Sequence, residues 1–178
     1  METSSNSLTE LSNQAKKLFA EGEYEQAANL FEKVFLEYEQ NGDVLNCAEN
    51  KNNCSVALLK AEFFQKALDV ISGTDLVFEN AGDKKRQGMA LGNQAAALEA
   101  LGNLEKALEK YQEASKILKE IDDHEYRPFV LKSISALEMR QGQIMQSMAT
   151  MKASIDGKKS PNLGDKILKQ LFGFIFKG

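Results

Sequence analysis

The sequence predicts an all-α protein, a right-handed α-solenoid of four helical hairpins with a C-terminal capping helix. Three observations support this fold class: a repeat without gaps, a helical spacing of apolar residues inside each repeat, and turn residues at matching positions. The chain of 178 residues has only two prolines and no tryptophan, which argues against a β-sandwich rich in turns. Because 43% of the residues are apolar and 27% are charged, the composition is typical of a folded globular chain.

The repeat appears when the chain is aligned on itself with a shift of 40 residues. Small residues, large apolar residues and turn residues then fall into separate columns across four units. Chance does not produce such a separation at one fixed period, so the chain is predicted to be an array of repeats. The columns are Gly22, Glu62, Gly102 and Gly142 for the turn, Ala15, Ser55, Ala95 and Ser135 and then Ala27, Ala67, Ala107 and Ser147 for small residues, and Phe31, Ile71, Tyr111 and Met151 for large residues.

Each unit is predicted to be a helical hairpin, because apolar residues recur at helical spacing on both sides of the turn. In the third unit Leu91, Ala95 and Leu98 form one stripe, and Leu104 and Ala107 begin a second. The small columns are expected where two helix backbones approach closely. The predicted units cover about residues 7–42, 43–82, 83–122 and 123–157, with helices at about 7–20, 24–39, 44–60, 64–79, 84–100, 104–120, 126–140 and 143–156, and a ninth near 161–176.

Residues at the predicted helix ends agree with this division. Gly42–Asp43 and Gly82–Asp83 are typical of a helix that ends at a glycine and is followed by an aspartate capping the next helix. Ser7–Glu10 has the spacing of a capping box, which predicts the start of the first helix. Pro128 is expected in the first turn of a helix, where its missing N–H costs little.

Composition excludes several classes of protein. The net charge of −4 gives no global attraction for nucleic acid, and the polar segment Met1–Glu10 lacks the apolar region of a signal peptide. No run of 18 apolar residues is present, so no transmembrane helix is expected. Two cysteines cannot build a disulfide scaffold and suit a reducing compartment. We therefore expect a cytoplasmic protein without a nucleic-acid partner, with an array over 1–160 and a tail over 161–178.

No constellation of residues predicts catalysis. His124 is the only histidine, and it is expected to be a solvated turn residue without a nucleophile or metal ligand beside it. Cys47 and Cys54 share a helix face and are expected to be core thiols, because a metal site would need further ligands. No phosphate-binding loop, G-x-S-x-G, H-E-x-x-H or G-x-G-x-x-G motif is present. The sequence thus predicts a protein that is not an enzyme and that binds no metal or cofactor.

The repeat pattern resembles the tetratricopeptide repeat superfamily over about residues 8–156. The resemblance is most specific in residues 100–114, which read like the turn and second helix of that family's repeat. The usual repeat has about 34 residues and ends with proline, whereas here each unit is longer and that proline is absent. The chain is therefore similar to the long-repeat branch, as in kinesin light chains and bacterial peptide-sensing regulators. The resemblance implies a scaffold that binds a protein or peptide in its concave groove, which the first helices line.

A ladder of polar residues is predicted on that groove. Asparagines recur at intervals of 40 inside helices, where they are middling helix formers, so their placement needs a reason. A side-chain amide both donates and accepts, so it can pair with a peptide backbone. The alternative is that these amides stabilise the packing between neighbouring repeats. The predicted peptide-binding residues are Asn13, Lys16, Asn52, Asn53, Lys60, Asn93, Lys132, Ser133 and Arg140.

The tail has a composition of its own. From Lys152 to Gly178 six lysines and two aspartates give a net charge of +4. Three functions are open for this tail: it caps the array over Met145, Met148 and Met151, it mediates self-association, or it contacts a membrane surface as part of a peripheral adaptor. Because three phenylalanines alternate near its end, at least one is expected to stay exposed. The apolar residues of the tail helix are Leu163, Ile167, Leu168, Leu171, Phe172, Phe174, Ile175 and Phe176.

Overall fold

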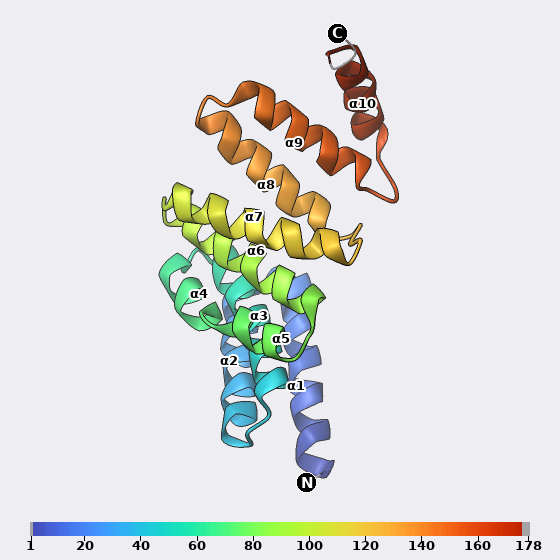
Figure 1. Cartoon of the computed structure of the whole chain (residues 1–178). Helices are drawn as coiled ribbons and strands as arrows, with labels where there is room; N and C mark the ends of the chain where they lie inside the picture. The colour runs from blue at the N-terminus through green and yellow to red at the C-terminus, as the bar shows by residue number, and fades with distance from the viewer. Residues whose placement is uncertain (1, 176–178) are drawn as a thin grey trace.

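The computed structural model describes residues 2–175, and in that range the chain forms ten α-helices and no strand (Figure 1). Most of the predicted helices are confirmed to within about two residues at each end. The helices are α1 (Glu2–Ala20), α2 (Tyr24–Gln40), α3 (Val44–Lys60), α4 (Phe64–Ile71), α5 (Thr74–Asn80), α6 (Lys84–Ala100), α7 (Leu104–Glu120), α8 (Arg127–Arg140), α9 (Ile144–Asp156) and α10 (Leu163–Ile175).

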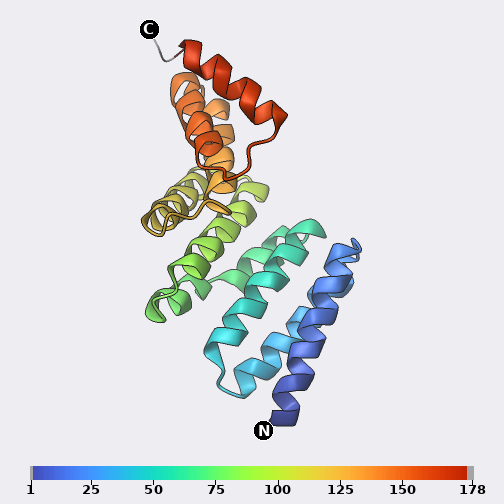
Figure 2. The ribbon, with the colours of Figure 1, turned by 90° about the vertical axis from the view of Figure 1, so that its right-hand side faces the viewer.

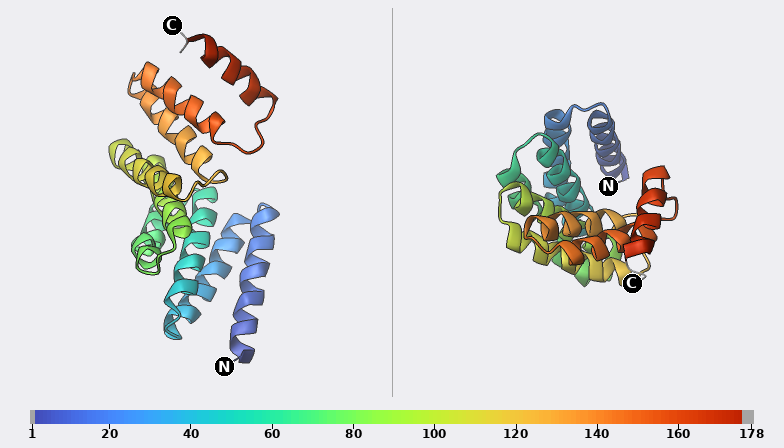
Figure 3. Two further views of the ribbon diagram at one scale, coloured as in Figure 1. Left: turned by 45° about the vertical axis from the view of Figure 1, so that its right-hand side comes forward. Right: turned by 90° about the horizontal axis from the view of Figure 1, so that it is seen from above.

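Consecutive helices pair into hairpins that stack along one direction, with the N-terminal helix and α10 at opposite ends of the array (Figures 1 and 2). Successive hairpins are rotated relative to one another, so the array twists along its length (Figures 2 and 3). Neighbouring hairpins also pack together, α2 against α3 and α7 against α8. The predicted fold class, an all-α solenoid of stacked helical hairpins, is confirmed (Figure 1).

The turn column is explained by backbone conformation. At Gly22 φ is +87°, a left-handed value, and the next amide, that of Glu23, donates to the Leu18 carbonyl at 2.9 Å. This is the hydrogen bond that closes a helix at a C-terminal glycine. Two residues with side chains adopt the same conformation elsewhere, Glu62 at φ +64° and Asp122 at φ +53°. A left-handed conformation costs such residues about 1–2 kcal/mol, so the array tolerates this loss at two of its turns.

The predicted helix caps are confirmed between hairpins and wrong at the first helix. The Asp43 side chain accepts from the Asn46 amide at 3.1 Å, and Asp83 accepts from the Arg86 amide at 2.9 Å. In contrast, α1 already begins at Glu2, so Ser7 lies inside the helix and caps nothing. Because no proline or glycine interrupts the preceding residues, the helix extends through the predicted start.

The second hairpin departs from the predicted pattern. A single helix over 64–79 was the expectation, and it is wrong: α4 ends at Ile71 and α5 begins at Thr74. Gly73 has φ +80° between them, and the Thr74 hydroxyl donates to the Ile71 carbonyl at 2.8 Å. A glycine in the left-handed region ends a helix, so Gly73 divides the hairpin's second arm. The break gives α5 its own direction. Phe78, on α5, is buried in the core.

Serines in the small columns are satisfied across the hairpin. The Ser135 hydroxyl donates to the Ser147 carbonyl at 2.8 Å, and the Ser147 hydroxyl donates to the Ser135 carbonyl at 2.8 Å. In the second unit the Ser55 hydroxyl donates to the Ala67 carbonyl at 2.9 Å. A buried hydroxyl is tolerated only with such a partner, so serine replaces alanine here because the opposite helix backbone is within reach.

One buried side chain in the fourth hairpin is only partly satisfied. Glu138 occupies the column that holds leucine in the other units, and 2% of it is exposed. Its Oε1 accepts from the Gln146 side chain at 2.8 Å, whereas its Oε2 has no hydrogen-bond partner among the described residues. An unsatisfied buried acceptor costs about 1–3 kcal/mol.

We therefore expect Glu138→Leu to stabilise the protein. The substitution restores the apolar column and removes the unsatisfied oxygen, so the free energy of unfolding should rise by about 1–3 kcal/mol. Urea denaturation followed by circular dichroism measures the change. Glu109→Leu, at an exposed position on α7, is the matched control and should leave stability nearly unchanged. A fall in stability for Glu138→Leu would mean that the carboxylate is fully solvated or paired in solution.

The last helix packs against α9 at the end of the array (Figure 1). Asn162 and Asp165 form a reciprocal capping box, and Asp165 also pairs with Lys158 at 2.8 Å. The Lys158 ammonium, with the Asn162 amide, holds the pKa of the Asp165 carboxyl below its usual range. Lys169 pairs with Asp156 at the end of α9 at 2.7 Å. Polar contacts at both ends of the connecting loop therefore fix where α10 lies.

The methionines of α9 are only partly covered. Met148 and Met151 are half-buried, but Met145 is 61% exposed, so the expectation that all three are covered is wrong. The ion pairs of α10 lie at the C-terminal end of α9, away from the turn that carries Met145. Phe172 is buried. Phe176 and the side chain of Phe174 lie outside the described residues, so the expected exposure of a phenylalanine stays a prediction.

Candidate functional site

The first helices of three neighbouring hairpins, with Phe31 of α2 and Tyr126, line an open cavity, which we call the inner cavity. Its volume is about 330 Å³. Four of the nine predicted groove residues line it, namely Lys16, Asn52, Asn53 and Asn93. They come from α1, α3 and α6. Asn53 and Asn93, which are 40 residues apart, lie at this one cavity, whereas Asn13 and Ser133 of the same column do not line it. The full lining is Lys16, Phe19, Phe31, Asn52, Asn53, Val56, Met89, Asn93 and Tyr126.

Two of the predicted amides are engaged inside the protein. The Asn93 Nδ2 group donates to Asn52 Oδ1 at 3.0 Å, and the Tyr126 hydroxyl donates to Asn93 Oδ1 at 2.8 Å. Asn93 on α6 therefore bridges α3 and the residue that precedes α8. Burial raises the pKa of the Tyr126 phenol to about 12, so this hydroxyl remains a donor at neutral pH. For Asn52 and Asn93 the structural alternative, packing between repeats, accounts for their placement.

Asn53 and Lys16, the other two predicted residues of the cavity, have polar groups without a partner among the described residues. Asn53 is half-buried and Lys16 is exposed, and neither side chain has a hydrogen-bond or ion-pair partner among the described residues. The Asn53 amide is not among the buried polar atoms that lack a partner, so it is open to water or to a ligand. The cavity thus offers a donor and acceptor at Asn53 and a cation at Lys16, beside an apolar floor.

The five remaining predicted residues do not line this cavity. Asn13 and Lys60 are exposed on α1 and at the end of α3. Arg140 pairs with Glu99 at 3.5 Å, and the same carboxylate accepts from the Tyr111 hydroxyl at 3.1 Å. The last two predicted residues are Lys132, exposed, and Ser133, half-buried, both on α8.

Sequence reasoning missed the apolar part of the site. Phe31 is predicted only as a member of the column of large residues, yet it also lines the cavity with Phe19 and Val56. Met89 stands at the position equivalent to Glu49 and Phe129 in the neighbouring units, a variation that the repeat alignment displays. Tyr126 follows the one inter-hairpin turn that lacks a glycine, and only the three-dimensional structure shows that this loop folds toward the groove.

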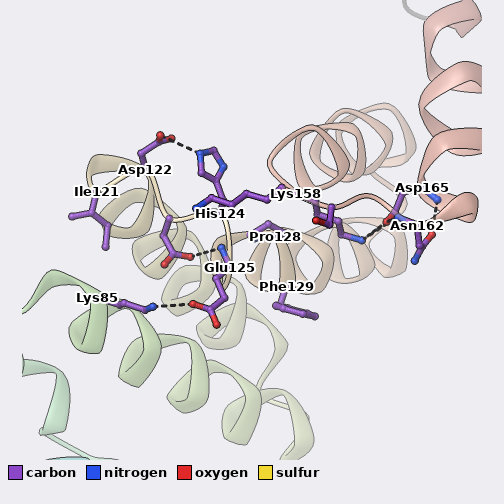
Figure 4. A pocket seen from close by; sticks show the side chains of 13 residues that line it. Lys85, Ile121, Asp122, His124, Glu125, Pro128, Phe129, Lys158, Asn162 and Asp165 are labelled. Atoms are coloured by element: carbon purple, nitrogen blue, oxygen red, sulfur yellow. Dashed lines mark hydrogen bonds and ion pairs between the residues drawn. The ribbon is translucent and has the colours of Figure 1, made fainter.

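A second, larger cleft lies between the α7–α8 loop and the α9–α10 loop (Figure 4). Its volume is about 720 Å³. Most of its charged side chains are already paired, as Lys85 is with Glu125 at 2.9 Å and Lys158 is with Asp165 at 2.8 Å. Phe129, 65% exposed, and Ile121, 39% exposed, form its open apolar wall. The cleft therefore offers a ligand few charged side chains that are not already paired within the protein.

His124 holds the two loops of this cleft together. Its Nδ1 lies 2.9 Å from the Gly157 carbonyl oxygen. Its Nε2 lies 3.1 Å from an Asp122 carboxylate oxygen (Figure 4). The expectation of a solvated turn histidine is wrong, because the ring is half-buried and contacts the end of α9. Within the described residues no group of three or more His, Cys, Asp and Glu side chains is placed to hold a metal ion.

The cysteines lie in the core, as predicted. Both are buried and unpaired, and the Cys54 thiol donates to the Ala28 carbonyl at 3.4 Å. Burial raises the pKa of Cys54 to about 12 and also raises the pKa of Cys47. Because the thiolate is the nucleophilic form, neither side chain is prepared for nucleophilic chemistry at neutral pH.

Comparison with known proteins identifies the fold. No family model and no curated protein matches the chain at a significant level. Among solved structures, the TPR-like repeats described as those of a kinesin light chain from Podosopora anserina superpose with a TM-score of 0.71 at 14% sequence identity, covering 84% of this chain and 74% of that one. A single-substitution variant of the same protein gives a TM-score of 0.72 at 14% identity, with 84% and 73% coverage. The chain has a TPR-like repeat fold.

Proposed function

We propose that the chain is a non-catalytic scaffold that binds an extended segment of a partner protein along its inner face. TPR-like repeat folds are generally protein-interaction scaffolds, which supports a binding role for this chain. The observation that supports binding at this place is the inner cavity, where Asn53 and Lys16 lack partners among the described residues beside an apolar floor. The two buried free thiols fit a reducing compartment, and we place the protein in the cytoplasm.

The cavity suits a short stretch of peptide. Its volume of about 330 Å³ lies at the lower end of the range for ligand sites, enough for one or two side chains. The Asn53 amide can accept from and donate to one peptide unit of the segment, and the Lys16 ammonium can pair with an acidic group beside it. The hydrogen bonds from Asn93 to Asn52 and from Tyr126 to Asn93 hold one wall in place before binding. A preformed wall lowers the entropic cost of association.

The experiment is a selection of peptides from a random display library on the full-length protein, followed by measurement of Kd for one selected peptide. Asn53→Ala should weaken binding by about 2- to 10-fold, because one amide hydrogen bond contributes about 0.5–1.5 kcal/mol. The melting temperature of this variant should stay at the wild-type value. Asn93→Ala should instead lower the melting temperature, since it removes the bonds to Asn52 and Tyr126.

Asn29→Ala is the matched control, because it removes an exposed amide of α2 outside the inner cavity. It should change neither Kd nor melting temperature. Lys16→Glu should weaken binding of a peptide that carries an acidic residue. If the selected peptide binds Asn53→Ala and Lys16→Glu as tightly as the wild type, the inner cavity is not the binding site.

A further inference from the structure

The last helix presents an apolar face to solvent. Leu163, Ile167, Leu171 and Ile175 are 74%, 53%, 52% and 46% exposed, and we call these four residues the outer face of α10. Leu168, beside them, is 40% exposed. Burying a leucine or isoleucine side chain contributes about 1.5–3 kcal/mol, so leaving five exposed on one short helix is costly. Such a patch marks an interaction surface.

Contacts on its opposite side hold α10 in this orientation. Asp165 and Phe172 are buried, and Lys169 pairs with Asp156 of α9. At 3.6 residues per turn, positions 165, 169 and 172 share one side of the helix, and positions 163, 167 and 171 share another. The outer face therefore points away from α9. Figures 1, 2 and 3 show α10 at the end of the array, where no further described helix lies beyond it.

The charges without an ion-pair partner on and beside this helix, among the described residues, are positive. The only acidic residue of α10 is Asp165, which is buried and paired with Lys158. Lys166 is exposed, as is Lys159 in the preceding loop, and neither has an ion-pair partner among the described residues. A surface of negative charge complements both lysines.

The width and length of the outer face also indicate what can bind to it. Four residues spaced by four positions drift by about 40° at each step, so they cover an arc of about 120°. The seam that a single partner helix contacts is narrower. A helix of 13 residues is about 20 Å long and is too short to cross a bilayer. No helix in the described range is both long and apolar enough for that role.

We propose that α10 docks in the interface of an anionic lipid membrane, with its outer face in the acyl region and Lys159 and Lys166 at the headgroups. A short helix with one apolar side and lysines at the border is the arrangement that lies in a membrane interface. Anionic headgroups attract each lysine near the surface. In this position the inner cavity remains available, so one end of the array is anchored while the groove binds its partner.

Insertion can be measured directly because the chain contains no tryptophan. The full-length variant Leu171→Trp places a single fluorophore on the outer face, and Leu76→Trp places one on the exposed side of α5 as the matched control. Vesicles of phosphatidylcholine with phosphatidylserine should shift the emission of Leu171→Trp to shorter wavelength and leave that of Leu76→Trp unchanged. No shift of Leu171→Trp on these vesicles would overturn the proposal.

Flotation of the full-length protein with the same vesicles tests the two components of binding. The double variant Ile167→Asp, Leu171→Asp should no longer float, whereas Val44→Asp, Leu76→Asp, with the same change of charge and similar loss of exposed apolar surface, should float like the wild type. Lys159→Gln and Lys166→Gln should each weaken binding about fivefold. All variants should melt like the wild type, because each position is exposed.

Two outcomes would contradict membrane docking. Equal flotation of Ile167→Asp, Leu171→Asp and of its control would show that binding does not use the outer face. A wild-type dimer in light scattering that becomes a monomer in this double variant, without any flotation, would assign the face to a second copy of the chain. Neither outcome bears on peptide binding in the inner cavity, which is measured separately.

Discussion

Replacing Ala107 by aspartate should lower the free energy of unfolding by about 3–5 kcal/mol, the range found for an uncompensated buried charge. Ala107 is 0% exposed and lies in a core cluster with Leu91, Ala95 and Tyr111. The small column exists because α6 and α7 approach closely there, so a carboxylate has neither room nor a cation. The change corresponds to a fall of roughly 10 °C in Tm for a chain of this length.

Thermal unfolding followed by circular dichroism at neutral pH measures this effect. Ala149→Asp is the matched control, since Ala149 is exposed in the middle of α9 and the change in composition is the same. The control should shift Tm by no more than a few degrees. Equal shifts for the two variants would show that Ala107 is not in a tight helix–helix contact.

Phe78→Ala should have the next largest effect and should also change the form of the transition. Phe78 is fully buried and packs with Ala48 of α3 and Ala90 of α6. The Arg86 guanidinium carbon lies 5.0 Å from its ring centroid. This small cluster stands between a larger one built on α1–α3 and another built on α6–α8. Removing a buried phenylalanine side chain costs about 3–5 kcal/mol. Here the loss weakens the contact between the two halves of the array, α1–α3 and α6–α8.

Because a repeat array is stabilised by neighbour contacts, weakening one interface should divide the transition into two steps. Hydrogen exchange measured by mass spectrometry in increasing urea should show peptides of α1–α3 and of α6–α8 opening at different urea concentrations in Phe78→Ala. In the wild type both sets should open together. Phe63→Ala, at a position 38% exposed, is the control and should keep the single transition. Coincident opening in Phe78→Ala would show that Phe78 does not couple the halves.

Some features of the candidate site could be predicted from the repeat spacing, and others depend on contacts between distant parts of the chain. The repeat spacing relates Asn53 to Asn93, which line one cavity together with the predicted residues Lys16 and Asn52. It does not distinguish Asn53, whose amide has no partner among the described residues, from Asn93, whose amide is bonded on two sides. That difference depends on Tyr126, which comes from a loop with no equivalent in the other units. Periodicity carries no information about such a residue.

The sequence by itself determined the repeat, the fold class, the ends of most helices, and the columns of small residues between paired helices. These features follow from local preferences and from a period that four units repeat, so each unit supports the assignment of the others. Only the tertiary structure decided that Gly73 divides a helix, that His124 joins two loops, and that α10 leaves Leu163, Ile167, Leu171 and Ile175 exposed. Each of these depends on contacts that occur once in the chain, and their outcome is set by packing angles that no repeat spacing contains.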